Sequence, residues 1–491
     1  MSAGGPASQA ITVTAPAGSG AVTGWRDGLR AADRGAAVVA LVEGELVDPV
    51  DLTRAMPALA AALRSPVVPF AEPVTRIETD GGPWVRRLPG GRVLAARRGP
   101  LVAALDRAAR EDPGGGLDAV ARALTTDLTG PAVLVEAMVR VPPGSGGTVL
   151  PRRTPRPPLV PAEVEGTALP EFDDAVRRWS VRTAVPFYAH REGWGDLHFA
   201  RGLAAALRRR GRAVTVDYRD SVDRAGVASE DVVVVLRGLE RLDPPDHGLG
   251  VLWVISHPEL VGDDELRAYD LVLAAGPRWA AETTARTGVP VLPLLQATDA
   301  RRFRPGPPDG PPADVLFVGN SRRVRRPVLD DALAAGADVT VYGDGWAEVL
   351  PGLAVAGRYL DNRELAAAYR TASVVLNDHW PDMAEGGFVS NRLFDAVASG
   401  ARVLSDEVSG VPGGLAALFG GAVRGPPGSV TATAGTATGA GTAGAGAART
   451  PAAASAGREA AHTAAAAHTA APSRIPRARV TALRYAPRAP G

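Results

Sequence analysis

The sequence contains neither cysteine nor lysine, and all 54 of its basic residues are arginine. Without cysteine the chain has no disulfide bond, no thiolate metal ligand and no cysteine nucleophile. Without lysine it is not a Schiff-base enzyme, a pyridoxal-phosphate enzyme or a protein with a Walker-type phosphate loop, because each of these needs an ammonium group. Any cationic side chain that contacts a phosphate in this protein must therefore be an arginine.

Long apolar runs and an excess of one charge are also missing. No run of about 18 apolar residues is present and no charged-then-apolar leader begins the sequence, so we expect neither a membrane span nor a secretion signal. The 54 basic and 53 acidic residues leave a formal net charge of +1, which does not favour nucleic acid as a partner. We therefore expect a cytoplasmic protein.

The length of 491 residues suggests about three domains. The 57 glycines and 43 prolines are unevenly placed, and two stretches of the sequence have little apolar periodicity. A proline- and arginine-rich stretch predicts a linker at 151–175, and an alanine-, glycine- and threonine-rich stretch predicts a disordered tail at 425–491. Three blocks remain as candidate domains, at 1–150, 176–300 and 301–424.

The second and third blocks alternate short apolar runs with helical patterns. Nearly continuous runs of apolar residues are typical of strands buried on both faces, as in a parallel sheet covered by helices. We therefore predict an α/β fold with two successive doubly wound, Rossmann-like domains. The predicted strands are 183–189, 213–218, 231–236, 251–255, 271–274 and 289–292 in the second block, and 314–318, 338–342, 373–376 and 402–404 in the third.

Two loops of the second block are candidates for binding or catalysis, because open α/β sheets bind ligands beyond the carboxyl ends of their strands. In the first loop, Gly193 and Gly195 would let backbone N–H groups approach an anion, and Asp196 is either a functional carboxylate or a helix N-cap. In the second, His257 follows the apolar run LWVI. It is either placed to polarise or deprotonate a hydroxyl group, or it is a capping or packing histidine.

The third block offers an arginine-rich loop. Gly319 and Asn320 follow the run DVLFV and precede four arginines in five positions, namely Arg322, Arg323, Arg325 and Arg326. A planar guanidinium can hold two phosphate oxygens at once. We expect at least one of these arginines, Arg326 by preference, to face a diphosphate. The alternative is the solvated start of a helix.

The run from 377 to 395 carries the most informative pattern in the sequence. It contains Asn377, a glycine pair that ends at Gly387, and the segment Ser390-Asn391-Arg392 at the predicted start of a helix, where free N–H groups attract an anion. Asp395 lies one turn further along the same helix face. This arrangement predicts phosphate at the helix start and a carboxylate that accepts ribose hydroxyls.

The stretch from about 185 to 411 resembles the GT-B glycosyltransferases, and most of all their CgeB-like (spore maturation protein-like) group. The segments that carry the resemblance are LWVISHPE, PLLQATDARRFRP, DVLFVGN with the RRP that follows it, and VLNDHW with EGGFVSNRLFDAVASGARVLSDE. The resemblance implies two Rossmann-like domains facing a cleft, a nucleotide-diphosphate sugar as donor, and no metal or other cofactor. It places Asp395 where the family has its ribose-binding glutamate, and Gly387 where the family often has another acid.

The first block is weakly similar to the GT-A fold of family 2 glycosyltransferases, through GWRDGLRAADRGAAVVALVEGELVDP. In that family paired aspartates hold a divalent ion, whereas the matching place here reads Glu43-Gly44-Glu45, with Asp48 just beyond. We therefore expect a partial, inactive α/β domain that serves as a structural partner.

These observations favour a metal-independent glycosyltransferase that acts on a hydroxyl acceptor, whether a glycan, a small molecule or a protein. Arginine and a helix N-terminus would stabilise the diphosphate leaving group, and His257 or Asp196 would lie on the acceptor side. The alternative is a non-catalytic scaffold that binds a sugar nucleotide or glycan. It is suggested by the low-complexity tail, which stands where GT-B chains usually have closing helices.

Overall fold

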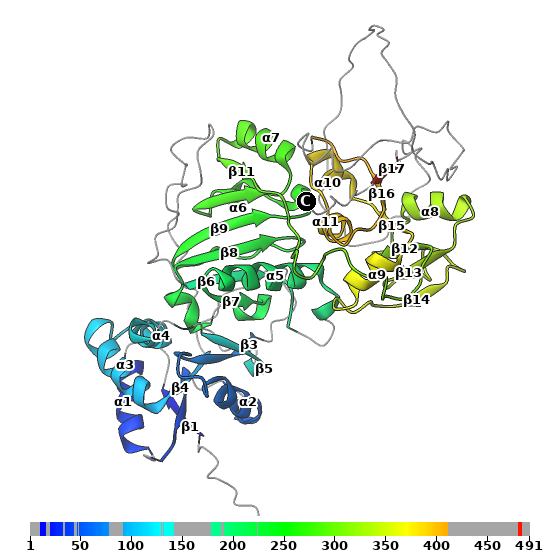
Figure 1. Cartoon of the computed structure of the whole chain (residues 1–491). Helices are drawn as coiled ribbons and strands as arrows, with labels where there is room; N and C mark the ends of the chain where they lie inside the picture. Colours follow the sequence, from blue (N-terminus) through cyan, green and yellow to red (C-terminus); the bar gives the residue numbers. More distant parts are fainter. Residues whose placement is uncertain are drawn as a thin grey trace, which may run out of the picture.

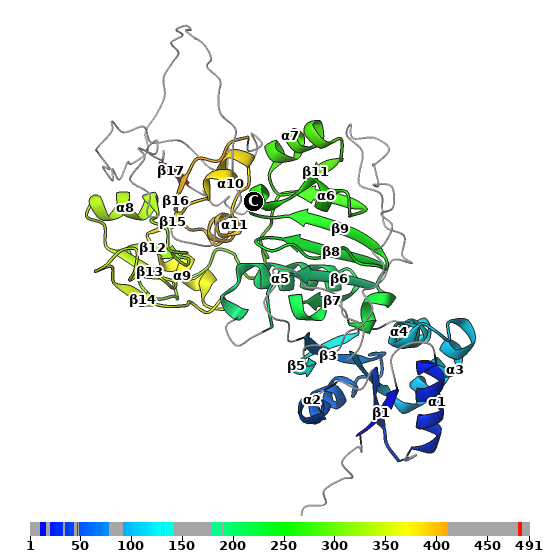
Figure 2. The ribbon, with the colours of Figure 1, turned by 180° about the vertical axis from the view of Figure 1, so that it is seen from behind.

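The computed structural model describes residues 10–15, 20–32, 35–43, 47, 49–77, 92–128, 130, 132–141, 178–187, 191–222, 224–410 and 480–483. Within these ranges the chain forms three sheets, one in each predicted block (Figure 1). The predicted linker at 151–175 and most of the predicted tail at 425–491 lie outside the described residues. In both views the middle domain lies between the other two (Figure 2).

The N-terminal domain is a mixed α/β unit. Its five-stranded sheet has the order β1-β2-β4-β3-β5, in which β4 runs antiparallel to β2 and β3. Helices α1, α3 and α4 pack on one face and α2 on the other. The elements are β1 (Ala10–Ala15), α1 (Ala21–Ala31), β2 (Val38–Glu43), α2 (Pro49–Ala62), β3 (Ala71–Ile77), β4 (Arg92–Arg97), α3 (Arg98–Glu111), α4 (Gly116–Asp127) and β5 (Val133–Val141).

The middle domain has a six-stranded, wholly parallel sheet in the order β11-β10-β9-β8-β6-β7. Strand β8 is buried along its whole length, which explains its continuous run of apolar residues. The strands are β6 (Arg178–Thr183), β7 (Ala213–Asp217), β8 (Val232–Arg237), β9 (Leu249–Val254), β10 (Leu271–Ala274) and β11 (Val291–Pro293). The α-helices are α5 (Gly195–Arg209), α6 (Asp263–Leu266) and α7 (Pro277–Thr287).

The first strand of the middle domain lies earlier than the sequence predicts. We expected it at 183–189, but β6 ends at Thr183. The strand was missed because its charged and polar side chains find buried partners that the local pattern does not reveal. Arg178 donates to the carbonyl oxygens of Leu128 and Gly130, and Ser180 donates to Asp217.

The third domain has the sheet order β14-β13-β12-β15-β16-β17, parallel except for β17. Its strands are β12 (Val315–Val318), β13 (Val339–Tyr342), β14 (Val355–Gly357), β15 (Val374–Asn377), β16 (Val403–Asp406) and β17 (Val480–Leu483). Its helices are α8 (Pro327–Ala334), α9 (Leu365–Thr371), α10 (Pro381–Gly386) and α11 (Asn391–Ala398). The prediction of two doubly wound domains is confirmed, and β17, from within the predicted tail, pairs antiparallel with β16.

A buried charge cluster joins the N-terminal and middle domains. The Arg224 guanidinium contacts the carboxylates of Glu72, Asp217 and Glu230, and all four side chains are at most 5% exposed. Glu72 comes from β3 and also accepts hydrogen bonds from the Gly226 amide. Burial raises the pKa of Glu72 to about 6 and that of Glu230 to about 7. The first block therefore contacts the middle domain through buried charged groups.

The turn beside this cluster positions the loop that follows β6. The Phe187 amide donates to Asp220 at 2.6 Å, and the Arg219 amide donates to the Val185 carbonyl at 3.0 Å. The ring of Phe187 packs edge-on against Tyr218. The start of the loop that leads to α5 is thus held against the domain core.

The middle and third domains share apolar packing. Met383 of α10 and Phe388 belong to the same buried cluster as residues of β8, β9 and β10. A Cβ at Gly276, which precedes α7, would lie 2.3 Å from the Phe388 ring. The close approach of the two domains therefore depends on a glycine at this position.

Candidate functional site

The carboxyl ends of the two parallel sheets meet at the junction of the middle and third domains. Asp196 and His257 follow β6 and β9 on one side, whereas Arg322 and Trp380 follow β12 and β15 on the other. A hydrogen bond of 3.4 Å joins the Arg322 Nη1 to the His257 Nε2 across the junction. Ligands bind at this edge in open α/β sheets, so the junction is the candidate site.

Two residues that face each other across the junction have an unfavourable backbone conformation. Among the described residues, the non-glycine residues with positive φ are His257 (52°), Arg322 (52°) and Arg323 (60°). This left-handed region costs roughly 1–2 kcal/mol for a residue with a Cβ, and such strain is concentrated at functional sites. The contact between His257 and Arg322 brings two of these residues together.

Two guanidinium groups lie over Trp380, and Asp378 links them to a third, that of Arg392. Arg326 and Arg322 lie over the Trp380 ring, with their central carbons 4.8 and 5.7 Å from its centroid. Asp378 pairs with Arg326 at 3.0 Å and lies 3.9 Å from Arg392. Burial, and then the positive charge of Arg326, lower the pKa of Arg322. Asp378 therefore contacts two of the three guanidinium groups, and the charges of Asp196 and Asp378 both act on the third, that of Arg322.

The four arginines of the sequence pattern divide into two pairs. Arg322 and Arg326 face the junction, whereas Arg323 and Arg325 pair with Glu348 and Asp330. The Nε atom of Arg326 is buried and has no hydrogen-bond partner among the described residues. A buried donor without an acceptor costs about 1–3 kcal/mol, which an anion bound here would recover.

Helix α11 begins beside this cluster with two free amides. Ser390 is the N-cap by position, but its hydroxyl donates to Asn377 Oδ1 at 2.8 Å instead of capping the helix. Its amide donates to His379 Nε2 at 2.9 Å. The amides of Asn391 and Arg392 have no partner among the described residues, and Arg392 also reaches Asn377 Oδ1 at 3.4 Å. We refer to Arg322, Arg326, Arg392 and these two amides as the anion site.

His379 and Asp406 support the start of α11, and the sequence did not reveal them as site residues. The buried His379 ring contacts Asp406 at 2.6 Å through Nδ1 and accepts the Ser390 amide at Nε2. A ring that accepts at Nε2 carries its proton on Nδ1, so Asp406 fixes the tautomer. The amide of Asn377 similarly donates to Ser405 at 2.9 Å. The anion site therefore rests on buried polar contacts from β15 and β16.

Asp395 lies on α11 as predicted, one turn beyond Asn391, but both its carboxylate oxygens have protein donors. Thr298 donates to one oxygen at 2.7 Å and the Asn391 side-chain amide to the other at 3.0 Å. Burial raises the pKa of Asp395 to about 7. The Asn391 Oδ1 is buried and has no partner among the described residues. The free hydrogen-bond acceptor at this place is thus on Asn391.

The remaining predicted residues of the third domain lie in different surroundings. A Cβ at Gly319 would be 2.8 Å from Arg392 Nη2, so the guanidinium group of Arg392 lies close to this glycine. Asn320 Oδ1 accepts the Asp344 amide, and its carbonyl accepts Arg326. Gly387 has a φ of 85° at the end of α10, and a Cβ there would be 2.9 Å from the Ser409 carbonyl. Its contacts are with the turn and α7 rather than with the anion site.

On the side of the middle domain, both ring nitrogens of His257 have partners. Glu259 lies 3.0 Å from Nδ1, and Arg322 donates to Nε2, which fits the neutral ring protonated on Nδ1. Gly193 and Gly195 are exposed beside the start of α5 and have open space around their Cα atoms. Neither contacts the anion site.

Asp196 is a half-buried carboxylate at the junction. It is the second residue of α5, so the alternative that it is an N-cap is wrong. Burial raises its pKa, while the positive charge of Arg322 acts in the opposite direction. No described residue donates a hydrogen bond to its carboxylate. The carboxylate lies close to Gly238, where a Cβ atom would be only 2.5 Å from it. Asp196 is therefore open to accept a proton or a hydrogen bond from a ligand.

In the N-terminal domain, Glu43 is engaged by an arginine. Arg92 pairs with Glu43 at 2.6 Å and with Asp118 at 2.5 Å, and the Glu43 side chain is 6% exposed. Residues 44–46 and 48, where the family 2 resemblance continues, lie outside the described residues. No cluster of metal-ligating side chains occurs in the part of the chain that the structure describes.

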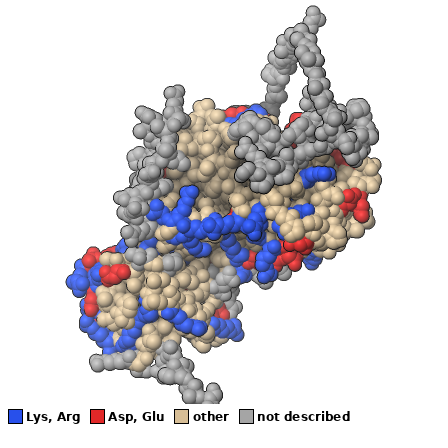
Figure 3. Space-filling view, in the orientation of Figure 1, with Lys and Arg blue, Asp and Glu red and all other residues tan. Residues whose placement is uncertain are grey.

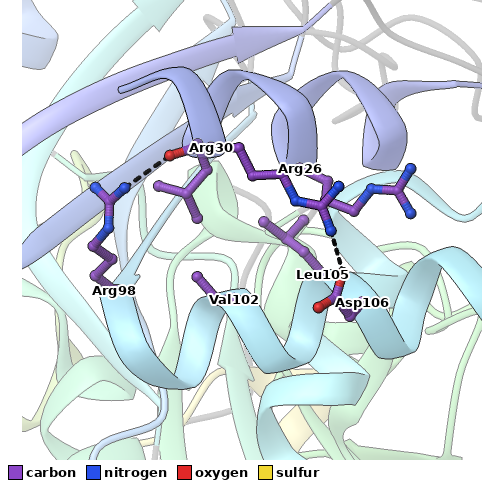
Figure 4. Close-up of a pocket in the computed structure, with 7 residues that line it drawn as sticks. Arg26, Arg30, Arg98, Val102, Leu105 and Asp106 are labelled. Atoms are coloured by element: carbon purple, nitrogen blue, oxygen red, sulfur yellow. Dashed lines mark hydrogen bonds and ion pairs between the residues drawn. The ribbon is translucent and has the colours of Figure 1, made fainter. Parts of the chain in front are cut away.

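A surface hollow of about 280 Å³ lies between α1 and α3 of the N-terminal domain (Figure 4). Leucine and valine side chains form its apolar part, and Arg30 and Asp106 at its edge pair with each other. None of the residues predicted to bind or react with a ligand lines it. The hollow is a feature of the N-terminal domain alone.

Two Rossmann-like domains that meet at the carboxyl ends of their parallel sheets define the GT-B architecture of glycosyltransferases. Residues 322–422 match a sequence family described as glycosyl transferase-like. The matched segment begins at Arg322 and includes Trp380 and the start of α11. No curated protein matches the chain. No helix within the described ranges has the length and apolar character needed to cross a bilayer.

Proposed function

We propose that this protein transfers a sugar from a nucleotide-diphosphate donor to a hydroxyl group of an acceptor, without a metal ion. The observation that carries the proposal is the charge imbalance at the anion site, where three guanidinium groups and two free amides face only the carboxylates of Asp378 and Asp196, so that positive charge is in excess. A diphosphate supplies the missing negative charge, and arginine can provide the countercharge that a metal ion provides elsewhere.

The neighbouring residues fit the remainder of such a donor. Asn391 Oδ1 is a buried acceptor without a donor, and a ribose hydroxyl would satisfy it. Asp395, which resembles the family's ribose-binding carboxylate by position, orients the Asn391 amide from behind. Trp380 presents the ring over which the two arginines lie.

In the transfer step, the acceptor oxygen bonds to the anomeric carbon while the bond from that carbon to the diphosphate oxygen breaks. The electron pair leaves with the diphosphate, whose growing charge the anion site stabilises. The acceptor proton passes to Asp196, the predicted residue that accepts no hydrogen bond from described residues. His257 already has partners on both nitrogens and holds Arg322 in place.

Isothermal titration of the full chain with uridine and guanosine diphosphate, in the presence of a chelator, tests the proposal. Arg326→Gln should weaken binding by about 30-fold or more, because losing a charge-assisted contact to a buried phosphate costs about 2–5 kcal/mol. Arg325→Gln is the matched control, since Arg325 is exposed and pairs with Asp330. Equal diphosphate affinity of both variants would contradict the assignment of the anion site. Nucleotide-sugar binding without transfer or hydrolysis would favour the non-catalytic scaffold.

A further inference from the structure

A band of arginine side chains crosses the middle domain along α5 (Figure 3). Residues 195–212 contain five arginines and one aspartate, and residues 299–304 contain three arginines and one aspartate. These two segments have six surplus positive charges, whereas the whole chain has a net charge of +1. We call their arginines the arginine band; they are Arg201, Arg208, Arg209, Arg210, Arg212, Arg301, Arg302 and Arg304.

The two segments of the band lie side by side. At one end, Arg209 of α5 is 3.9 Å from Asp299. At the other end, burial lowers the pKa of His198, and the nearby charges of Arg201 and Arg302 add to this effect. The helix rises about 16 Å between positions 198 and 209. The band is therefore an extended strip of positive charge rather than a pocket.

Much of this charge is not neutralised by the protein. Arg209, Arg210 and Arg301 are exposed, and the last two make no side-chain hydrogen bond or ion pair with a described residue. The Nη2 atom of Arg302 is buried without a hydrogen-bond partner in the described part of the chain. The arginine band is thus available to an external anion.

The arginine band ends at the candidate site. Helix α5 carries Asp196 in its first turn, where the junction with the third domain lies. The segment that contains Arg302 follows Thr298, which donates to Asp395 of α11. The charge of Arg302 also acts on Asp395. An anionic chain bound along the strip would reach the proposed proton acceptor.

We propose that the arginine band binds an elongated polyanion whose hydroxyl groups accept the transferred sugar. This assignment of the ligand rests on the proposed function, because it takes the polyanion to be the acceptor of the transferred sugar. Guanidinium groups bind phosphate and carboxylate oxygens alike, so the shared chemistry is a hydroxyl-bearing chain with repeated anionic groups.

The composition of the strip favours such a chain over a lipid surface or a nucleic acid. None of the large exposed apolar side chains in the described ranges lies on α5 or in 299–304. A membrane-binding surface buries apolar side chains among the lipids, and single-stranded nucleic acids stack on aromatic rings. The arginine band offers charge without either feature.

The test compares two charge-matched variants of the full chain. The band variant combines Arg209→Gln, Arg210→Gln and Arg301→Gln. The control combines Arg267→Gln, Arg286→Gln and Arg325→Gln, which are exposed residues at α6, α7 and α8. The probes are long-chain inorganic polyphosphate, polygalacturonate, neutral dextran, and vesicles of phosphatidylglycerol with phosphatidylcholine. Binding is measured at several salt concentrations.

We expect the band variant to bind polyphosphate or polygalacturonate about tenfold more weakly than the wild type. The slope of the logarithm of the binding constant against the logarithm of the salt concentration should be shallower by about two units. The control variant should bind like the wild type, and dextran should not bind. The preferred polymer identifies phosphate or carboxylate as the anionic group.

An equal loss of affinity in the control variant would overturn the proposal, as would vesicle binding without polymer binding. Diphosphate titration of the same variants separates the two hypotheses. If no variant binds a diphosphate while polymer binding follows the band, the proposed donor site is wrong but the strip remains a polyanion site.

Discussion

The buried carboxyl group of Asp395 should make the stability of the protein depend on pH. Its pKa rises from an ordinary 3.8 to about 7, so the folded protein holds this proton more tightly than the unfolded chain does. The free energy of unfolding therefore increases as the pH falls, by about 1.4 kcal/mol per unit between pH 7 and pH 4. Between about pH 8 and pH 5.5 the gain is about 2 kcal/mol.

Asp395→Asn removes this titration while keeping the shape of the side chain. Thr298 can still donate to the amide oxygen, and a flip of Asn391 presents its partnerless Oδ1 to the new amide group. Relative to the wild type, the variant should gain about 2 kcal/mol in unfolding free energy on going from pH 5.5 to pH 8.

Urea unfolding of both proteins at several pH values measures this difference by linear extrapolation. Asp331→Asn, at an exposed position on α8, serves as the control and should follow the wild type at each pH. A constant difference between wild type and Asp395→Asn across the range would refute the reasoning, because it would mean that Asp395 titrates alike in the folded and unfolded chain.

Three further predictions concern other parts of the molecule. Gly276→Ala should lower the unfolding free energy by about 1–3 kcal/mol in urea, because its Cβ would collide with Phe388; an unchanged midpoint would contradict the packing of the two domains. Arg92→Met should cost about 3–5 kcal/mol in the same assay, since it leaves the Glu43 carboxylate buried and unpaired, and a loss below 1 kcal/mol would show that the pair is dispensable. Trp380→Ala should weaken diphosphate binding by roughly tenfold in calorimetry, because two guanidinium groups lose the ring that positions them, and wild-type affinity would argue against that role.

The sequence predicts strands well where burial on both faces forces a continuous apolar run. Strand β10 is found at the predicted residues, and β8 differs by one residue at each end. Strand β6 was misplaced because Arg178, Ser180 and Arg182 occupy buried positions. Their compensating acceptors are contributed by other segments of the chain. A local pattern contains the polar residue but not its partner.

The same limit separates the predicted part of the candidate site from the rest. The contact between Asn391 and Asp395 follows from their spacing on one helix, and it is observed. The contact of His257 with Arg322 joins residues 65 positions apart, so it depends on how the two domains pack. The role of Trp380 had a signal in the sequence, since it closes the run NDHW after a buried strand, but only the fold brings the arginines onto its ring.

Burial alone does not distinguish a binding arginine from a structural one in a chain that has no lysine. Arg224 is buried against three carboxylates, Arg237 pairs with Glu265 at 2.8 Å, and Arg92 lies between two carboxylates. Each of these guanidinium groups has at least one carboxylate partner of its own, so no positive charge is left there for an anionic ligand to neutralise. At the anion site three guanidinium groups face only the carboxylates of Asp378 and Asp196, and the buried Arg326 Nε has no acceptor among the described residues. Since unpaired charge is costly to bury, it persists where another group supplies the opposite charge. The imbalance, rather than the presence of arginine, is what points to an anionic ligand at the junction.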